Sequence, residues 1–173
     1  SMACFPMCAR CQKEYHNPGN RRFHAQPNAC PACGPHLWAS AQDGTVLAGD
    51  HQALDLVARD LCQGRIGAIK GLGGFHLACL AFDQQAVQLL RHRKNRPGKP
   101  LALMVPDLEA AEGLAQLSPA DRDWLTGGIQ PILLVPKRQD AELPPILAPD
   151  TDSIGLMLPY TPLHHVLFAR LRQ

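Results

Sequence analysis

The chain has 173 residues, of which 46% are hydrophobic and 18% charged, with a formal net charge of +2. This composition excludes a disordered tail and allows one domain of ordinary size with a small appendage. Aromatic residues make up only 5% of the sequence, which disfavours a nucleic-acid platform built from stacked rings. No stretch reaches the roughly 20 apolar residues that a membrane-spanning helix needs, so we expect no membrane association.

Two Cys-x-x-Cys pairs stand near the start of the sequence, formed by Cys8 with Cys11 and by Cys30 with Cys33. Each pair can hold two thiolates on one tight turn, and the loop between the pairs lets them converge on a tetrahedral zinc ion. We therefore predict a zinc finger over residues 1–38 that depends on its metal for folding. The same pattern leaves disulfides or a redox pair as alternatives. If further pairs lie upstream in a longer chain, the two pairs could also ligate different zinc ions.

The clustering of cysteines into metal-type pairs favours a reducing compartment, and we expect the protein to be cytoplasmic. Residues 39–49 look like a connector, and the main domain is expected over 50–173. Within it, a helix should begin at Asp50 as its N-cap and end at Gly64. Further helices are expected at 83–93, 107–117, 118–128 and 161–171, and strands at 66–69, 101–105, 132–135 and 153–158, while 75–81 is either a strand or a short helix.

This alternation of strands and helices predicts an α/β fold. The proline-rich, acidic segment at 136–152 is expected to be a surface loop, and it favours a mixed sheet over a purely parallel one. After the strand at 66–69, Lys70 leads into a loop with three glycines. That loop matches neither the Rossmann nor the Walker pattern, and such glycines often serve only close backbone packing. His76 beside it could contact a substrate or be an interior histidine bonded to protein groups.

A dense basic cluster follows the helix at 83–93, and prolines flank it. Several donors on one constrained loop between two expected sheet elements suit a polyanion such as a triphosphate. The alternative is a solvated helix end, stabilised by the helix dipole by less than about 1 kcal/mol per charge. The cluster comprises Arg91, Arg93, Lys94, Arg96 and Lys99.

The stretch KGLGGFHLAC followed by RKNRPGKPLALMV resembles the YrdC-like domain. Together with RRFHAQPNACPACGP and DSIGLMLPYTPLHH, it is similar to the hydrogenase-maturation carbamoyltransferases of the HypF family. The resemblance implies a twisted mixed sheet with flanking helices, preceded by a small Cys4 zinc finger. It also implies a fragment, because family members carry acylphosphatase-like and Kae1-like domains as well. The family's later serine/asparagine motif would lie beyond Gln173, leaving a truncated domain with a sheet edge that could pair with a second copy.

The resemblance further implies a reaction. In this family the YrdC-like domain joins carbamate, derived from carbamoyl phosphate, to ATP with Mg²⁺, and it releases pyrophosphate. The carbamoyl group of the resulting adenylate then passes to the C-terminal cysteine of HypE, toward the cyanide ligands of [NiFe] hydrogenase. Two alternatives remain for this sequence. One is binding of double-stranded RNA, which is attributed to YrdC-like domains, and the other is a zinc scaffold without activity.

The family motifs assign roles to individual residues. Lys94 and Arg96 belong to a K-x-R-P motif and would neutralise the departing pyrophosphate, because adenylation mainly requires positioning and charge neutralisation. Phe75 lies where the wider family often has a tyrosine before its pocket. We therefore predict Lys70 and His76 as catalytic residues, and we expect Lys70 and the amides around Gly73 and Gly74 to line a small pocket for carbamate or the acyl phosphate. The predicted cofactor-binding residues are Gly73, Gly74, Phe75, Arg93, Lys94, Arg96, Lys99 and Ser153.

Overall fold

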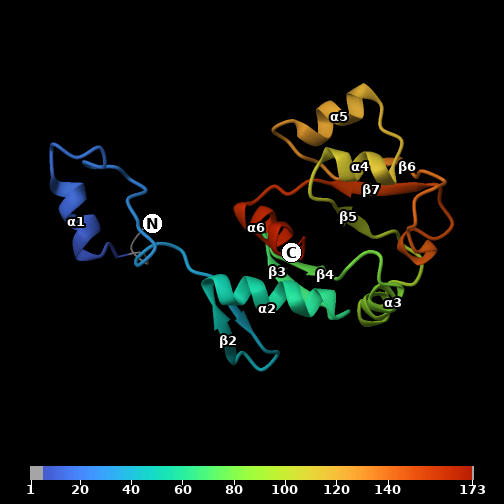
Figure 1. Cartoon of the computed structure of the whole chain (residues 1–173), viewed down its shortest axis with the longest axis horizontal. Helices are drawn as coiled ribbons and strands as arrows, with labels where there is room; N and C mark the ends of the chain where they lie inside the picture. Colours follow the sequence, from blue (N-terminus) through green and yellow to red (C-terminus); the bar gives the residue numbers. More distant parts are fainter. Residues whose placement is uncertain (1–5, 173) are drawn as a thin grey trace. The chain divides into compact units, whose positions relative to one another are not determined.

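The computed structural model describes residues 6–172, which form two compact units divided between Ala53 and Leu54. Figure 1 shows the elements of both units in chain order. The first unit contains the helix α1 (Ala9–His16) and an antiparallel hairpin of β1 (Trp38–Ser40) and β2 (Val46–Gly49). The segment 39–49, expected only as a connector, therefore contains most of a hairpin. The helix α2 (Asp50–Cys62) follows directly.

Asp50 does not have the capping role that its residue type suggested. It is the first residue of α2, with φ at +44°. Its carboxylate accepts a hydrogen bond from the backbone N–H of Leu37 at 3.3 Å, and it lies 3.3 Å from the Nδ1 atom of His36. The side chain thus fixes the chain entering β1, and these hydrogen bonds lower the pKa of Asp50.

The second unit is built on a three-stranded mixed sheet with the order β5-β7-β6. The central strand β7 (Ser153–Met157) pairs in parallel with β5 (Ala102–Met104) and antiparallel with β6 (Leu133–Pro136). This is the mixed α/β arrangement expected from the sequence. A separate antiparallel hairpin is formed by β3 (Gly67–Lys70) and β4 (Phe75–Ala78), so the segment after the glycine loop is a strand.

Helices of the second unit begin at polar residues that bond the first backbone N–H groups. The Asp83 carboxylate accepts from two such groups, and Ser118 forms a reciprocal capping box with Asp121, as their residue types predict. None of the helices in the described part of the chain has the length and apolar character to span a lipid bilayer. The helices are α3 (Gln84–Arg93), α4 (Leu108–Leu114), α5 (Pro119–Thr126) and α6 (Pro162–Leu171), and a 3₁₀ turn, η2 (Pro145–Leu147), interrupts the proline-rich loop.

The main core lies against the sheet, where Val87, Leu125, Val135, Ile154 and Leu156 are almost fully buried. A smaller cluster joins α2, α6 and the β3–β4 hairpin through Ala58, Leu61 and Leu167, against which Ile69 packs. Burial of each large aliphatic side chain contributes about 1.5–3 kcal/mol. The two clusters hold the glycine loop and the strands of the mixed sheet within one unit.

Arg91 is the most deeply buried charged side chain of the second unit, with 4% of its surface exposed. It forms no ion pair within residues 6–172. Burial, and after it the charge of Arg96, lowers the pKa of Arg91. Its guanidinium instead donates to backbone carbonyl oxygens, those of Ile146 (2.6 Å), Arg96 (2.8 Å), Lys99 (3.1 Å), Leu147 (3.1 Å) and Pro97 (3.2 Å).

We call these contacts the Arg91 carbonyl cage. The cage ties the end of α3 to both the basic loop and η2, which lies 55 residues further along the chain. A planar guanidinium can satisfy several carbonyl groups at once, because its donors point in fixed, diverging directions. The conformation of the basic loop is therefore set from inside the protein.

We predict that Arg91→Lys lowers the free energy of unfolding by about 2 kcal/mol or more. The lysine ammonium group is a single point of donors and cannot reach the carbonyl groups of both segments at once. Each buried carbonyl left unpaired costs about 1–3 kcal/mol. The matched control is Arg93→Lys, two residues away and exposed, which should change stability by less than about 0.5 kcal/mol. Urea unfolding followed by circular dichroism measures both. Equal effects of the two substitutions would contradict a structural role for the cage.

Candidate functional site

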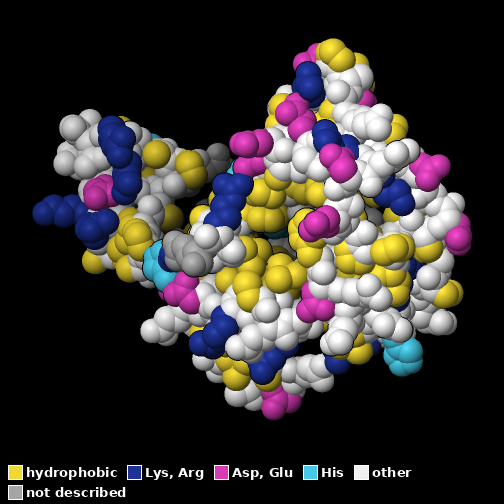
Figure 2. Space-filling view, turned by 45° about the vertical axis from the view of Figure 1, so that its right-hand side comes forward, with side chains coloured by type: hydrophobic (Ala, Val, Ile, Leu, Met, Phe, Trp, Pro, Cys, Tyr) yellow, Lys and Arg dark blue, Asp and Glu magenta, His cyan; other side chains and the backbone are white. Residues whose placement is uncertain are grey.

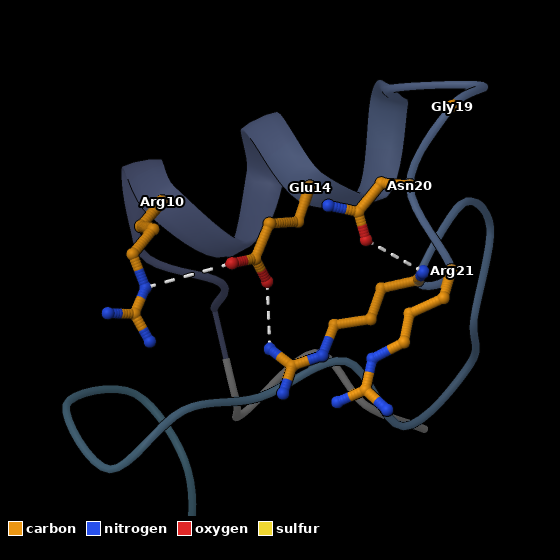
Figure 3. A pocket seen from close by; sticks show the side chains of 6 residues that line it. Arg10, Glu14, Gly19, Asn20 and Arg21 are labelled. Carbon is orange, nitrogen blue, oxygen red and sulfur yellow. Dashed lines mark hydrogen bonds and ion pairs between the residues drawn. The ribbon is translucent and has the colours of Figure 1, made fainter.

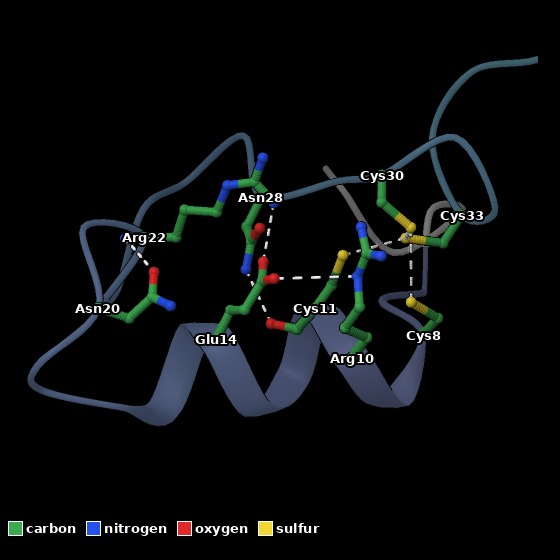
Figure 4. A network of polar contacts seen from close by, with 9 residues as sticks. All are labelled: Cys8, Arg10, Cys11, Glu14, Asn20, Arg22, Asn28, Cys30 and Cys33. Atoms are coloured by element: carbon green, nitrogen blue, oxygen red, sulfur yellow. Dashed lines mark hydrogen bonds and ion pairs between the residues drawn. The ribbon is translucent and has the colours of Figure 1, made fainter.

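Four cysteine side chains converge in the first unit (Figure 4). Their Sγ atoms all lie within 4.8 Å of one another, and three neighbouring pairs are 3.6, 3.7 and 3.8 Å apart. A zinc ion with Zn–S bonds of about 2.3 Å requires tetrahedron edges of about 3.8 Å. The sulfur atoms of Cys8, Cys11, Cys30 and Cys33 therefore have the spacing of a single Cys4 zinc site, and all four are free thiols. This geometry fits a structural zinc ion and brings together the four predicted ligands.

The electrostatics of the four sulfur atoms also favour a bound cation. Hydrogen bonds from the backbone amides of Cys8 and Cys30 lower the pKa of Cys33 to about 6, and the Ala32 amide lowers the pKa of Cys30. Burial, together with the neighbouring sulfur atoms, raises the pKa of Cys11 to about 12. Thiolates are thus favoured at one side of the cluster and disfavoured at the other. A divalent ion at the centre removes this conflict, because it stabilises all four as thiolates.

The first unit has almost no apolar core of its own. Among residues 6–49 only Cys11 and Asn28 are buried, and the Asn28 Nδ2 atom donates to the Cys11 carbonyl at 2.8 Å. Glu14 accepts from Arg22 at 2.8 Å on the surface of the same segment (Figure 4). With so little apolar surface removed from water, metal coordination has to supply most of the folding free energy.

The second unit contains a hollow of about 480 Å³ beside the glycine loop. Its walls are mainly apolar side chains, among them Leu72, Ile129 and Ile132, and its polar groups include His76 and Tyr160. Figure 2 shows hydrophobic side chains gathered around a hollowed part of the surface. An apolar hollow with a few placed polar groups has the usual character of a small-molecule site.

His76 and Tyr160 form the polar edge of this hollow. The Tyr160 hydroxyl lies 2.9 Å from the His76 Nε2 atom, and the two residues are 84 positions apart in the chain. Behind them, the His164 ring meets the Tyr160 ring edge-on, with centroids 4.6 Å apart. His76 thus has a protein partner and also lines the hollow, where a substrate contact remains a prediction.

Gly71 is required by this pair, although the sequence did not single it out as a site residue. A Cβ atom at this position would lie 2.8 Å from His76 Nε2 and 3.0 Å from the Tyr160 hydroxyl. Its N–H donates to the Gly74 carbonyl at 2.7 Å, which closes the loop, and Gly74 has φ at +156°. Glycine is therefore needed at position 71 for space and at position 74 for its backbone conformation.

The remaining predicted residues lie outside the walls of the hollow. The Lys70 Nζ atom is 5.0 Å from the centroid of the Phe75 ring, a cation–π arrangement at the mouth of the β3–β4 hairpin. Phe75 is 68% exposed, and a side chain at Gly73 would meet nothing within 4 Å. Ser153 is the first residue of β7, and its backbone N–H donates to the Thr151 hydroxyl at 3.2 Å.

The basic loop also differs from what charge alone suggested. Arg96 donates to the carbonyl oxygens of Lys99 at 3.4 Å and Pro100 at 2.9 Å, so its guanidinium folds back on the loop. Arg93, Lys94 and Lys99 are exposed. None of these side chains is among the residues that line the hollow, so the structure does not join the two into one pocket.

Sequence reasoning counted Arg91 only as a member of the basic cluster and missed the Arg91 carbonyl cage. A signal was present, because Arg91 follows Val87 and Leu90 on the inward stripe of α3. A charged residue on an apolar stripe needs buried partners, and the proline-rich loop supplied them.

Comparison with known proteins identifies both units. A Sua5/YciO/YrdC family model, described as telomere recombination, matches residues 59–173, and a HypF finger model matches residues 7–39. The chain is 53% identical over 167 residues to carbamoyltransferase HypF of Rhodobacter capsulatus, covering 96% of this chain and 22% of that protein. It is 46% identical over 132 residues to the HypF of Synechocystis sp., covering 76% of this chain and 17% of that protein. The chain therefore spans about a fifth of the length of these relatives.

Solved structures agree with these matches. A full-length HypF in a phosphate- and nucleotide-bound form superposes with a TM-score of 0.79 at 42% identity, covering 98% of this chain and 22% of that one. Sua5 of P. abyssi, complexed with L-threonine, gives a TM-score of 0.64 at 21% identity, covering 73% of this chain and 38% of that one, a likeness of fold alone. The YrdC-like fold, the Cys4 finger and the resemblance to HypF are thereby confirmed.

We predict that Cys11→Ser abolishes zinc binding and unfolds the first unit, whereas the second unit stays folded. Structural zinc contributes about 10–16 kcal/mol of apparent binding free energy in finger peptides, and the first unit has little else to hold it. The control is Cys62→Ser, because Cys62 is exposed and outside the cluster. Zinc content by atomic emission, with amide spectra of both units, measures the effect. Full zinc retention in the Cys11 variant would contradict the Cys4 assignment.

We also predict that His164 destabilises the protein in mild acid. Burial, followed by the charges of His76 and His165, lowers its pKa below the ordinary 6.5. Below pH 6.5 the unfolded chain therefore takes up a proton that the folded one resists, and stability falls at up to about 1.4 kcal/mol per pH unit. His164→Gln should weaken this loss between pH 6.5 and 5, and His92→Gln, at an exposed histidine of α3, should not. Unfolding free energies at pH 7, 6 and 5 test this, and equal slopes in both variants would contradict it.

Proposed function

The chain belongs to the Sua5/YciO/YrdC family and carries a HypF-type finger, and from this premise we propose that it forms the adenylating part of a HypF carbamoyltransferase. In this proposal the second unit joins carbamate, derived from carbamoyl phosphate, to ATP and releases pyrophosphate. The carbamoyl group then passes to the C-terminal cysteine of a HypE-type partner during cytoplasmic maturation of [NiFe] hydrogenase.

The observation that carries the proposal is the hydrogen-bonded pair of His76 and Tyr160 at the edge of the apolar hollow. Carbamate is a small planar anion with two acceptor oxygen atoms and an amino donor. A phenol and an imidazole can meet both kinds of group, since each donates and accepts. The apolar walls offer a surface on which the face of a purine can pack.

The phosphate side of the reaction is assigned to the basic loop, with roles changed by its geometry. Arg91 and Arg96 draw the backbone carbonyl oxygens of the loop inward, where these oxygens cannot repel an anion. Lys94 and Lys99 are left as exposed point charges, with Arg93 beside them. In our proposal Lys94 and Lys99 contact the departing pyrophosphate directly, and Arg96 acts by shaping the loop.

Magnesium would enter with the nucleotide. The described residues contain no cluster of carboxylates that could hold a metal ion, since the four cysteines are the one group of that kind. Mg²⁺ commonly keeps several waters and binds through substrate phosphates. The chain's own contribution is then to hold ATP and carbamate in line for attack at the α-phosphorus.

A scaffold role without catalysis is the second candidate. It is favoured by the separation of the basic loop from the walls of the hollow. In that case the finger would dock neighbouring domains, or the exposed edge strand β6, with Leu134 70% exposed, would pair with a second copy. Double-stranded RNA bound by the basic loop is a third use of the same charges, distinguished by affinity that falls steeply with salt and ignores ATP.

We predict that the chain binds ATP with Mg²⁺ and that Lys94→Ala weakens this binding about tenfold, the loss expected for one charge-assisted contact of about 1.4 kcal/mol. The matched control is Lys13→Ala, an exposed lysine of α1 in the finger, which should leave affinity unchanged. Calorimetric titration measures both. Absence of ATP binding, or equal affinities in the two variants, would contradict the proposal and leave the scaffold role.

A further inference from the structure

The finger has a shallow polar basin of about 350 Å³ that the proposed function does not use. Six residues line it: Arg10, Glu14, Gly19, Asn20, Arg21 and Arg22. Figure 3 shows Arg10 and Arg21 on opposite sides of the Glu14 carboxylate. All six belong to the first unit, and none is a cysteine of the metal cluster.

Local contacts hold two of the three arginines in place. The Glu14 carboxylate accepts from the Arg22 Nη1 atom at 2.8 Å and lies 3.8 Å from the Arg10 Nε atom. The Asn20 side chain accepts from the Arg22 backbone N–H at 2.9 Å, which fixes the chain where the two arginines follow each other. Arg21 makes no ion pair or side-chain hydrogen bond within residues 6–172, and it is exposed.

The charge of the basin decides what it fits. Three guanidinium groups and one carboxylate give a local charge of 3 − 1 = +2 from the six lining residues. A small phosphate anion carries about −1.5 to −2 at pH 7, whereas a carboxylate carries only one negative charge. A nucleic-acid backbone carries one negative charge per phosphate but presents several of them in a row. Guanidinium forks also match the oxygen atoms of a phosphate in pairs.

We propose that this basin binds a phosphate group. The lining residues include no apolar or aromatic side chain, so the basin holds the phosphate and not a nucleobase. The phosphate comes either from a small anion such as inorganic phosphate or from the backbone of a nucleic acid. Because every residue of the basin lies in the finger, the inference does not depend on adenylation in the second unit.

The test uses the zinc-loaded chain, which is titrated with inorganic phosphate. Chloride replaces phosphate to keep the ionic strength constant, and a titration with chloride alone serves as the comparison. The Nε–Hε resonances of ¹⁵N-labelled arginine report each side chain. Arg10, Arg21 and Arg22 should shift together and saturate, and Arg21→Gln should weaken the affinity at least fivefold. Arg59→Gln, at an exposed arginine of α2 in the second unit, is the matched control and should change nothing at the basin.

A second variant, Glu14→Gln, should change the phosphate affinity in the opposite direction. Glu14→Gln removes the one negative charge of the basin, so phosphate should bind more tightly, opposite to the effect of Arg21→Gln. Shifts that grow linearly without saturation, equal shifts with chloride, or an unchanged affinity in the Arg21 variant would each overturn the proposal. Retained zinc content shows that the finger of each variant is folded.

A competition arm identifies the source of the phosphate. Pyrophosphate and a mixed-sequence RNA oligonucleotide are each added to the phosphate-saturated chain. Displacement by RNA, lost in Arg21→Gln and steeply dependent on salt, supports a nucleic-acid backbone. Displacement by pyrophosphate without any effect of RNA supports a small anion. Both results support the basin as a phosphate site.

Discussion

The second unit depends on a buried cation that has no anionic partner among the described residues. Arg91 is almost inaccessible to water, and backbone carbonyl groups from the adjacent basic loop and from the distant proline-rich loop take the place of a counterion. Burying a charge in this way is costly unless every donor is used. The compensation requires the basic loop and the proline-rich loop to adopt one particular course around the guanidinium. The positions of the exposed lysines are a consequence of that internal constraint.

The first unit has a different problem, because its core is very small. Its buried residues are a cysteine and an asparagine, which cannot offset the conformational entropy of ordering some forty residues. The sulfur atoms are already at tetrahedral spacing, so a metal ion can supply the missing free energy. The arginines around Glu14 lie on the surface of this unit, where their ion pairs contribute little to its folding.

Local signals in the sequence predicted most of the elements and the four metal ligands. Caps such as Asp83 and Ser118 could be predicted because their partners lie within three residues. Asp50 has the same chemistry, yet its partner Leu37 is thirteen residues upstream, and no local rule reports such a contact. The helix α1 was missed because its segment is polar and its one buried residue is a metal ligand.

The basic loop shows why charge in a sequence does not determine where a charge points. Arg91, Arg93, Lys94 and Arg96 are equivalent members of one cluster when only the sequence is considered. The structure separates them by what carbonyl groups lie within reach, since two arginines turn inward while Lys94 and Arg93 stay exposed. Prolines contribute to this outcome, because a proline carbonyl remains an acceptor although the residue has no N–H to pair within the loop. In this loop, Arg91 and Arg96 hold the backbone through its carbonyl groups, and Arg93, Lys94 and Lys99 are left exposed to solvent.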